Sequence, residues 1–332
     1  MTARVGLVVN PAAGRDIRRL TGGASVSNNY AKRRTAECVL AGVGVVDDAE
    51  VVVMPDTSGI ADQVVASASD DVEAGLLGIE PTGGPRDTRL AAARFREVAD
   101  AVVVLGGDGT NRDVGTNVGD VPVVSVSTGT NNVVPTAVDG TVAGMAAAVV
   151  ADGAADADAV SYRHGTAVAQ VDGRTKRETV TGLATVGVVD EAFVGTRALL
   201  DAGSLLGGVA SRAAPGEIGI SGAAGTVHRV EPDDPGGVGV RFAPAEEATR
   251  RVRAVTVPGV VSELGVDDCR RLDAGEPFLF EVETAVVSAD GERELEVRDA
   301  EIAIRAVDDG PKVVDVDAAL AAAAEAGFFV ER

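Results

Sequence analysis

The sequence Gly106-Gly107-Asp108-Gly109-Thr110 constrains this chain more than any other stretch. It directly follows residues 101–105, a short apolar run typical of a strand that is buried on both faces. Residues 110–118 can form a helix, so we expect the glycines at a strand-to-helix turn. Such a turn leaves backbone N–H groups unpaired at a helix N-terminus, and glycines let a phosphate approach them closely.

Asp108 is the acidic residue of this turn. A carboxylate beside a polyphosphate is unfavourable unless it binds a cation or accepts a proton, so Asp108 indicates Mg²⁺ coordination or general-base catalysis. The alternative for a bare Gly-Gly-Asp-Gly sequence is a glycine-rich turn of an α/β sheet, in which Asp108 caps the helix.

The first 150 residues alternate between strand and helix patterns. A strand ends at Asn10-Pro11, where Asn10 is either a turn former or a ligand for phosphate or ribose. Further strands are expected at 51–54, 76–79 and 121–126, and helices at 31–42, 60–66, 89–98 and 141–150. This alternation predicts a mostly parallel sheet that is covered on both faces. A second small polar loop at 127–135 then converges with residues 106–110 at one sheet edge.

Residues 151–158 are the best candidate linker. After them the sequence changes from alternating strand and helix patterns to a series of strand patterns. Turn sequences such as Asp172-Gly173 and Asp290-Gly291 favour an antiparallel second domain. Its expected strands are 166–171, 179–189, 217–220, 226–230, 239–242, 253–257, 277–287 and 301–307. We expect a Rossmann-like α/β domain at 1–150, a β-rich domain at 159–310, and a helix and tail at 311–332 that pack back on the body.

The chain carries 51 acidic and 30 basic residues, a net charge of -21. This charge makes a chain soluble but self-repelling when screening is weak, and it argues against nucleic acid or anionic membranes as partners. The balance resembles proteins of salt-accumulating (halophilic) microorganisms; an ordinary acidic cytosolic protein is the alternative. Cys38 and Cys269 lie far apart without metal-ligand spacing, which favours reduced thiols. Together with the lack of a signal-peptide core, these features predict a cytoplasmic protein.

The sequence lacks the motifs and residues that several common enzyme classes require. There is no Gly-x-x-x-x-Gly-Lys-Ser/Thr motif and no Gly-x-Gly-x-x-Gly after the first strand, which argues against a P-loop enzyme and a dehydrogenase. His164 and His228 are the only histidines, so a histidine metal cluster or a serine triad is not expected.

Taken together, the motifs resemble the ATP-NAD kinase family and, within it, the acetoin-catabolism protein X-like branch. The segments that carry the resemblance are residues 6–14, 106–113, 129–132, 190–198 and 218–225. Diacylglycerol and sphingosine kinases are similar in having Asn-Pro-x-x-Gly, Gly-Gly-Asp-Gly-Thr and a following Gly-Thr-x-Asn. The resemblance implies a Rossmann-like domain and a β-rich domain with the active site between them, and it implies homo-oligomers.

The resemblance also implies roles for individual residues. The family's motif aspartate, at the substrate ribose and the phosphate-transfer site, corresponds to Asp108. Its Asn-Glu pair, which holds the adenosine half of the dinucleotide, falls on Asp190-Glu191, where Asp replaces Asn. Its adenine-binding Gly-Ser-Thr-Ala-Tyr loop corresponds to residues 221–225, where Ser221 stays but the other hydroxyls and the Tyr are gone.

The predicted function is phosphoryl transfer from ATP or polyphosphate to a hydroxyl, with Mg²⁺ and with the NAD 2′-hydroxyl as acceptor, giving NADP. Asp108 is the predicted catalytic residue and Mg²⁺ ligand, and Asp190, Glu191 and Ser221 are the predicted substrate ligands. The predicted phosphate-binding residues are Asn10, Gly14, Gly106, Gly107, Gly109, Thr110, Gly129, Thr130, Asn131 and Asn132. The alternatives are a lipid or small-alcohol kinase, and a nucleotide-binding regulator without catalysis.

Overall fold

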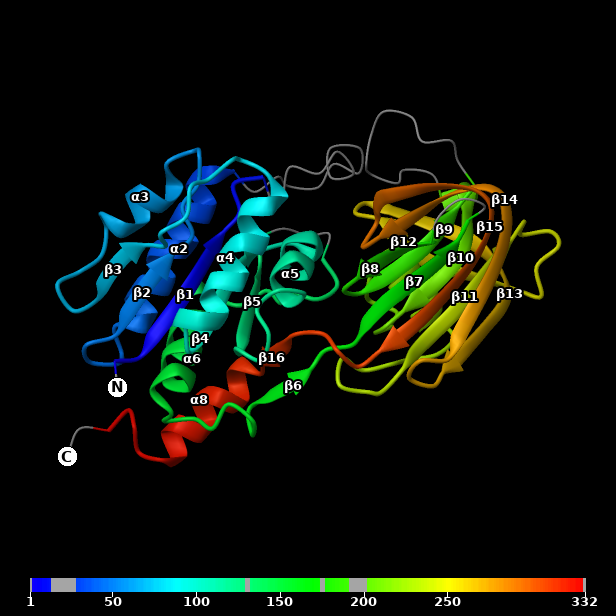
Figure 1. The fold of residues 1–332 in the computed structure, drawn as a ribbon. Helices are drawn as coiled ribbons and strands as arrows, with labels where there is room; N and C mark the ends of the chain where they lie inside the picture. The colour runs from blue at the N-terminus through cyan, green and yellow to red at the C-terminus, as the bar shows by residue number, and fades with distance from the viewer. Residues whose placement is uncertain (1, 13–27, 129–131, 174–176, 191–201, 331–332) are drawn as a thin grey trace.

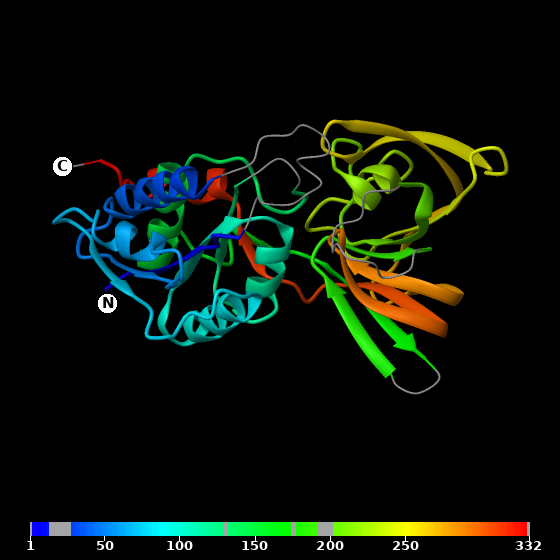
Figure 2. The same cartoon turned by 90° about the horizontal axis from the view of Figure 1, so that it is seen from above.

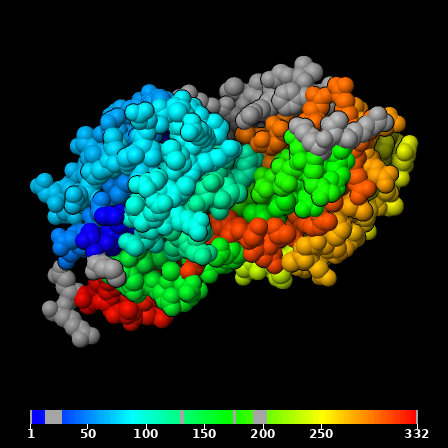
Figure 3. Space-filling model, viewed as in Figure 1, coloured from blue at the N-terminus to red at the C-terminus, as the bar shows by residue number. Residues whose placement is uncertain are grey.

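The structure is a computed structural model that describes residues 2–12, 28–128, 132–173, 177–190 and 202–330. The chain forms two domains that lie side by side (Figures 1 and 3). The first is an α/β domain with a mostly parallel sheet, and the second is β-rich and antiparallel. The predicted fold class is therefore confirmed.

The first domain is built on a seven-stranded sheet in the order β3-β2-β1-β4-β5-β16-β6. Its neighbouring strands are parallel except for β6, which is antiparallel to β16. The strands are β1 (Arg4–Val9), β2 (Glu50–Val53), β3 (Glu73–Leu76), β4 (Ala101–Gly106), β5 (Val123–Ser127), β6 (Ser161–Arg163) and β16 (Lys312–Val314). Every residue of β4 is buried, as expected for a central strand covered on both faces.

Helices cover both faces of this sheet (Figure 2). The helices are α2 (Asn29–Val43), α3 (Ile60–Val65), α4 (Pro85–Val98), α5 (Asp108–Gly115), α6 (Gly140–Asp152) and α8 (Val316–Glu325). Residues of α2, α3, α6 and α8 share one apolar core, and Phe95 of α4 and Val114 of α5 belong to the core on the other face. Helices α2 and α6 approach very closely, because a Cβ at Gly144 would lie 2.2 Å from the carbonyl oxygen of Val39. Small residues thus let a core poor in aromatics pack densely.

The second domain is a nine-stranded antiparallel sheet in the order β12-β13-β11-β10-β9-β14-β15-β7-β8. Its strands are β7 (Thr166–Asp172), β8 (Arg177–Gly182), β9 (Thr185–Val189), β10 (Leu205–Ala210), β11 (Gly237–Ala243), β12 (Arg250–Val257), β13 (Val260–Leu272), β14 (Pro277–Ala289) and β15 (Glu292–Val307). A short 3₁₀ helix η1 (Ala202–Ser204) precedes β10, and helix α7 (Gly219–Gly225) follows it.

Three strand predictions in this domain are wrong. The predicted strand 179–189 is two strands, β8 and β9, which are separated by a turn. The predicted strand 217–220 gives way to α7, because Gly219 takes a φ of 68° that an extended strand does not allow. At 226–230, Val230 makes only an isolated bridge to Ala213.

The chain crosses between the domains twice, from β6 to β7 and from β15 back to β16. Strands β6 and β16 pair with each other and extend the first sheet, although they flank the whole second domain in sequence (Figure 1). Helix α8 follows β16 and packs against α6. Among the described residues, no helix is both long enough and apolar enough to cross a membrane.

Candidate active site

Asp108 is the first residue of α5, immediately after the N-cap residue Gly107. Its carboxylate turns away from the helix toward the loop that follows β5, and it accepts hydrogen bonds from that loop. The backbone nitrogen of Val133 lies 3.0 and 2.9 Å from the two carboxylate oxygens, and that of Val134 lies 2.9 Å from Oδ1. The side chain therefore joins two loops of the sheet edge and does not cap its own helix.

The carboxylate of Asp108 is buried, with 8% of the residue exposed. Burial, and after it the negative charge of Asp290, raise its pKa from 3.8 to about 7. The N–H groups of Val134 and Val133 and the charge of Arg212 oppose this rise only in part. Asp108 thus changes its protonation state near neutral pH, as a group that exchanges a proton with a substrate must.

Asn10 and Thr110 lie together at the carboxyl ends of β1 and β4. The amide nitrogen Nδ2 of Asn10 donates to Oγ1 of Thr110 over 2.9 Å, and Oδ1 of Asn10 accepts from the backbone of Ala12 over 2.8 Å. Thr110 also fills the space beside Gly106, where a Cβ would lie 2.5 Å from the Cβ of Thr110. Gly106 is therefore needed so that Thr110 can reach Asn10.

Asn132 connects the second polar loop to the glycine-rich turn. A Cβ at Gly107 would lie 2.8 Å from Oδ1 of Asn132, so the loop rests directly on this glycine. The amide of Asn132 donates to Oγ of Ser127 over 2.6 Å, and the backbone nitrogen of Thr128 donates to the carbonyl of Gly106 over 3.3 Å. The structure thus brings Asn132, Gly107 and Asp108 to one edge of the sheet.

Lys32 is a charged residue at this edge that the sequence motifs did not identify. It lies near the start of α2, is 1% exposed, and donates from Nζ to the carbonyl of Pro11 over 2.7 Å. It therefore holds a positive charge beside the Asn10-Pro11 turn. The one feature of the sequence that could have drawn attention to Lys32 is the rarity of lysine, since the chain has only three.

The second domain contributes charged groups through the turn between β14 and β15. Asp290 in this turn accepts from the backbone nitrogens of Leu183, Ala184 and Thr185 over 2.9, 2.8 and 3.0 Å. Its Oδ2 also lies 3.5 Å from Nη1 of Arg112 on α5. Sequence inspection identified Asp290 only as part of a turn, because its partners lie more than a hundred positions away.

Arg212 is a further cation from the second domain. It follows β10, and its Nε lies 2.7 Å from Oε1 of Glu217. Its positive charge lowers the pKa of Asp108, against the larger effects of burial and of Asp290. An acidic and a basic group of the second domain, Asp290 and Arg212, therefore both act on Asp108.

The other predicted ligands are placed differently or lie outside the described residues. Asp190 is exposed at the end of β9, and its backbone nitrogen donates to Ser204 over 2.8 Å. Ser221 is completely buried in α7, and its hydroxyl has no hydrogen-bond partner among the described residues. Gly109 lies on α5, where an added Cβ would have Oε1 of Glu292 as its nearest neighbour, at 3.9 Å. Outside the described part of the chain are Gly14, Gly129, Thr130, Asn131 and Glu191.

Two family models match the chain in succession. The ATP-NAD kinase N-terminal domain matches residues 5–154, and the acetoin catabolism protein X C-terminal domain matches residues 168–309. The acetoin catabolism protein X of Cupriavidus necator is 30% identical over 328 residues, which cover 95% of this chain and 91% of that protein.

Solved structures with a similar fold include yeast NADH kinase complexed with NADH. It matches with a TM-score of 0.52 and 13% identity over 94% of this chain and 83% of that one. A diacylglycerol kinase from Bacillus anthracis str. Sterne matches with a TM-score of 0.33 and 12% identity, over 94% of this chain and 96% of that one. From the two family models and the full-length relative, we conclude that the chain belongs to the acetoin catabolism protein X family, whose N-terminal domain is of the ATP-NAD kinase type.

Proposed function

We propose that this protein is a kinase that transfers a phosphoryl group from ATP to the 2′-hydroxyl of NAD, giving NADP. The observation that carries the proposal is the position of Asp108. Its carboxylate lies where the loops after β4 and β5 meet, close to charges from the second domain, and its pKa is about 7. A general base works best when its pKa is near the working pH.

In the proposed reaction, Asp108 accepts the proton of the attacking hydroxyl. A carboxylate offers about four lone-pair positions, and the bonds from Val133 and Val134 occupy three of them. One position is left for the substrate. Because Asp108 is 8% exposed, the hydroxyl reaches it only after the loop at Val133 or the second domain moves aside.

The phosphates of the donor would lie against the turn formed by Gly106, Gly107 and the first turn of α5. The backbone N–H groups there and the helix dipole favour negative charge. Lys32 holds the Asn10-Pro11 turn, at the end of the neighbouring strand β1, through the carbonyl of Pro11. Phosphoryl transfer depends mainly on such positioning and on charge stabilisation, and this arrangement provides both.

Mg²⁺ fits this site as a companion of the phosphates. The one lone-pair position left on Asp108 can serve the substrate hydroxyl or Mg²⁺ but not both, and the described residues contain no group of three or more His, Cys, Asp or Glu side chains that could hold an ion. With the hydroxyl on Asp108, phosphate oxygens and water would supply the ligands of Mg²⁺, as is common for this ion. The ion would neutralise charge on the transferred group.

A different small alcohol is the second candidate acceptor. Asp190 stands where the resemblance implies a dinucleotide-holding Asn, and its side chain is exposed in the described structure. The relative from Cupriavidus necator is named for acetoin catabolism rather than for NADP synthesis. Both observations favour testing alcohols beside NAD.

The test is an incubation of the full chain with γ-labelled ATP and Mg²⁺ in molar KCl, with NAD or with a panel of small alcohols and lipids. Polyphosphate replaces ATP in a parallel series. We expect labelled NADP from the wild type and a rate at least about a hundredfold lower from Asp108→Asn. The matched control is Asp113→Asn, on the same helix and paired with Arg89 at 2.7 Å. NADP formation by Asp108→Asn at the wild-type rate would falsify the proposal, and label on another alcohol would replace NAD as the acceptor.

A further inference from the structure

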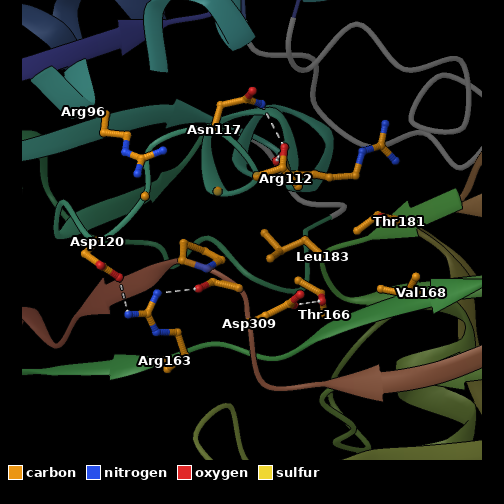
Figure 4. Close-up of a pocket in the computed structure, with 15 residues that line it drawn as sticks. Arg96, Arg112, Asn117, Asp120, Arg163, Thr166, Val168, Thr181, Leu183 and Asp309 are labelled. Atoms are coloured by element: carbon orange, nitrogen blue, oxygen red, sulfur yellow. Dashed lines mark hydrogen bonds and ion pairs between the residues drawn. The ribbon is translucent and has the colours of Figure 1, made fainter. Parts of the chain in front are cut away.

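We propose a second binding site, for a small organic carboxylate that carries a hydroxyl or oxo group, in a pocket between the two domains. The pocket has a volume of about 380 Å³. Helices α4 and α5 line it from the first domain, strands β7 and β8 line it from the second, and both crossing segments form its floor (Figure 4). Ligand pockets in proteins span about 300–1,000 Å³, so this one suits a small molecule and not a dinucleotide.

One end of the pocket carries the charge that would bind the carboxylate. Arg163 donates to Asp120 over 2.6 Å and to the carbonyl of Gly310 over 3.1 Å. Arg96 lies beside them, and it makes no hydrogen bond or ion pair with any described residue (Figure 4). Two guanidinium groups against one carboxylate leave this end with a net positive charge. The charge of Arg96 also acts on Asp120, but its planar guanidinium makes no hydrogen bond to a described residue, so its N–H groups suit a bidentate bond with a carboxylate.

The charged residues toward the other end, Arg112 and Asp309, are already engaged: Arg112 pairs with Asp290 and Glu294, and Asp309 accepts a hydrogen bond from Thr166 (Figure 4). Thr181 and Val168 lie there, away from Arg96, Asp120 and Arg163 (Figure 4). The hydroxyl of Thr181 is without a hydrogen-bond partner in the described part of the chain, so it can bind a hydroxyl or oxo group. Leu183 supplies apolar surface between the two ends. This division into an anion end, an apolar middle and a hydroxyl end defines the proposed ligand.

The pocket touches the parts of the molecule that hold the domains together. Arg163 and Pro311 belong to the two crossing segments, so an occupant would contact both at once. Leu183 also packs with Val134, whose backbone nitrogen binds Asp108. An occupant would therefore contact both crossing segments and the side chain of Leu183, which packs on Val134.

Calorimetric titration of the full chain tests the proposal without any need for kinase activity. The probes are sodium pyruvate and sodium lactate, with uncharged hydroxyacetone and inorganic phosphate as comparisons, all at constant ionic strength. We expect one carboxylate per chain, at least tenfold weaker binding of hydroxyacetone and phosphate, and no competition from ATP or NAD. Failure of both carboxylates to bind at millimolar concentration would overturn the proposal, as would competition with the nucleotides.

Variants locate the site. Arg96→Gln should weaken pyruvate binding at least tenfold, and glutamine keeps the aliphatic stem that packs on Gly119, so the fold should be retained. The control is Arg94→Gln on the same helix, an exposed residue paired with Glu97, which should change binding less than twofold. Thr181→Val should weaken lactate binding and leave the unfolding temperature unchanged. Equal binding by wild type and Arg96→Gln contradicts the assignment.

Discussion

Nη1 of Arg112 on α5 lies 3.5 Å from Oδ2 of Asp290 in the β14–β15 turn, and this ion pair joins the two domains. The side chains are 11% and 1% exposed, so little water screens the pair. Arg112 also donates to the carbonyl of Ala289 over 3.2 Å and to Glu294 over 2.9 Å. The same Asp290 raises the pKa of Asp108, so the contact between the domains also sets the chemistry of the candidate base.

Arg112→Ala should destabilise the protein by about 3 kcal/mol or more, because it leaves Asp290 buried without its cation. Urea denaturation of the full chain measures the change. The control Arg94→Ala removes an exposed pair with Glu97 and should cost less than about 1 kcal/mol. Equal losses in the two variants would contradict a structural role for the Arg112–Asp290 pair.

Asp290→Asn should lower the pKa of Asp108, because it removes a neighbouring negative charge. Burial, which is the larger cause of the raised pKa, stays in the variant, so the value should remain above 3.8. Carbon-13 NMR of labelled aspartate carboxyls follows the titration, and Asp108→Asn identifies the signal. A pKa that stays the same or rises would show that Asp290 does not act on Asp108 by charge.

Asp108 and His164 should give opposite pH dependences of stability. The pKa of Asp108 is raised from 3.8 to about 7, so its stabilising contribution is complete below pH 3.8 and is lost as the pH rises to about 7. Burial lowers the pKa of His164 from 6.5 to about 4, so its contribution is complete above pH 6.5 and is lost as the pH falls to about 4. Between about pH 4 and 6.5 the two effects oppose each other.

Single variants should separate these effects. Relative to the wild type, Asp108→Asn should make stability rise more steeply with pH in this window, and His164→Gln should make it fall. Each change has a limit of about 1.4 kcal/mol per pH unit. Denaturation at half-unit pH steps supplies the data. Identical slopes in the wild type and both variants would mean that neither group is buried as described.

Substitution by alanine should change the stability of the protein differently at Gly106 and at Gly109. Gly106→Ala places a Cβ 2.5 Å from Thr110 and should cost about 1–3 kcal/mol through overpacking. Gly109→Ala meets nothing nearer than 3.9 Å and lies inside α5, where alanine is favoured over glycine by about 0.5–1 kcal/mol. Thermal unfolding of both variants checks this contrast. A destabilised Gly109→Ala would indicate that the turn needs glycine for its backbone conformation.

The first domain was largely predictable, because its strands and helices carry periodic apolar patterns and alternate along the chain. The position of Asp108 at the meeting of two loops follows from the same pattern. The bonds from Val133 and Val134 do not follow from it, since they depend on the exact path of a loop. The Arg112–Asp290 contact joins residues that are distant in sequence and show no local signal of pairing.

Short elements with weak patterns were the least predictable. Strands β6 and β16 have three residues each, too few for a periodicity to appear. Helix α7 was predicted in part as a strand, because Ile218 and Ile220 alternate with glycine. Its small residues instead allow the helix to lie close to β12, which the sequence alone does not reveal.

The pairing of β6 with β16 has a consequence for biosynthesis. The ribosome makes β1 to β6 first, then the whole second domain, and only then β16, which is the second neighbour of β5 and the only neighbour of β6 in the sheet. The edge strand of the first sheet therefore stays unpaired while well over a hundred further residues are synthesised. Until β16 is made, the free edge of β5 is open to pairing with strands of other chains, so synthesis is the stage at which this topology is most exposed to misassembly.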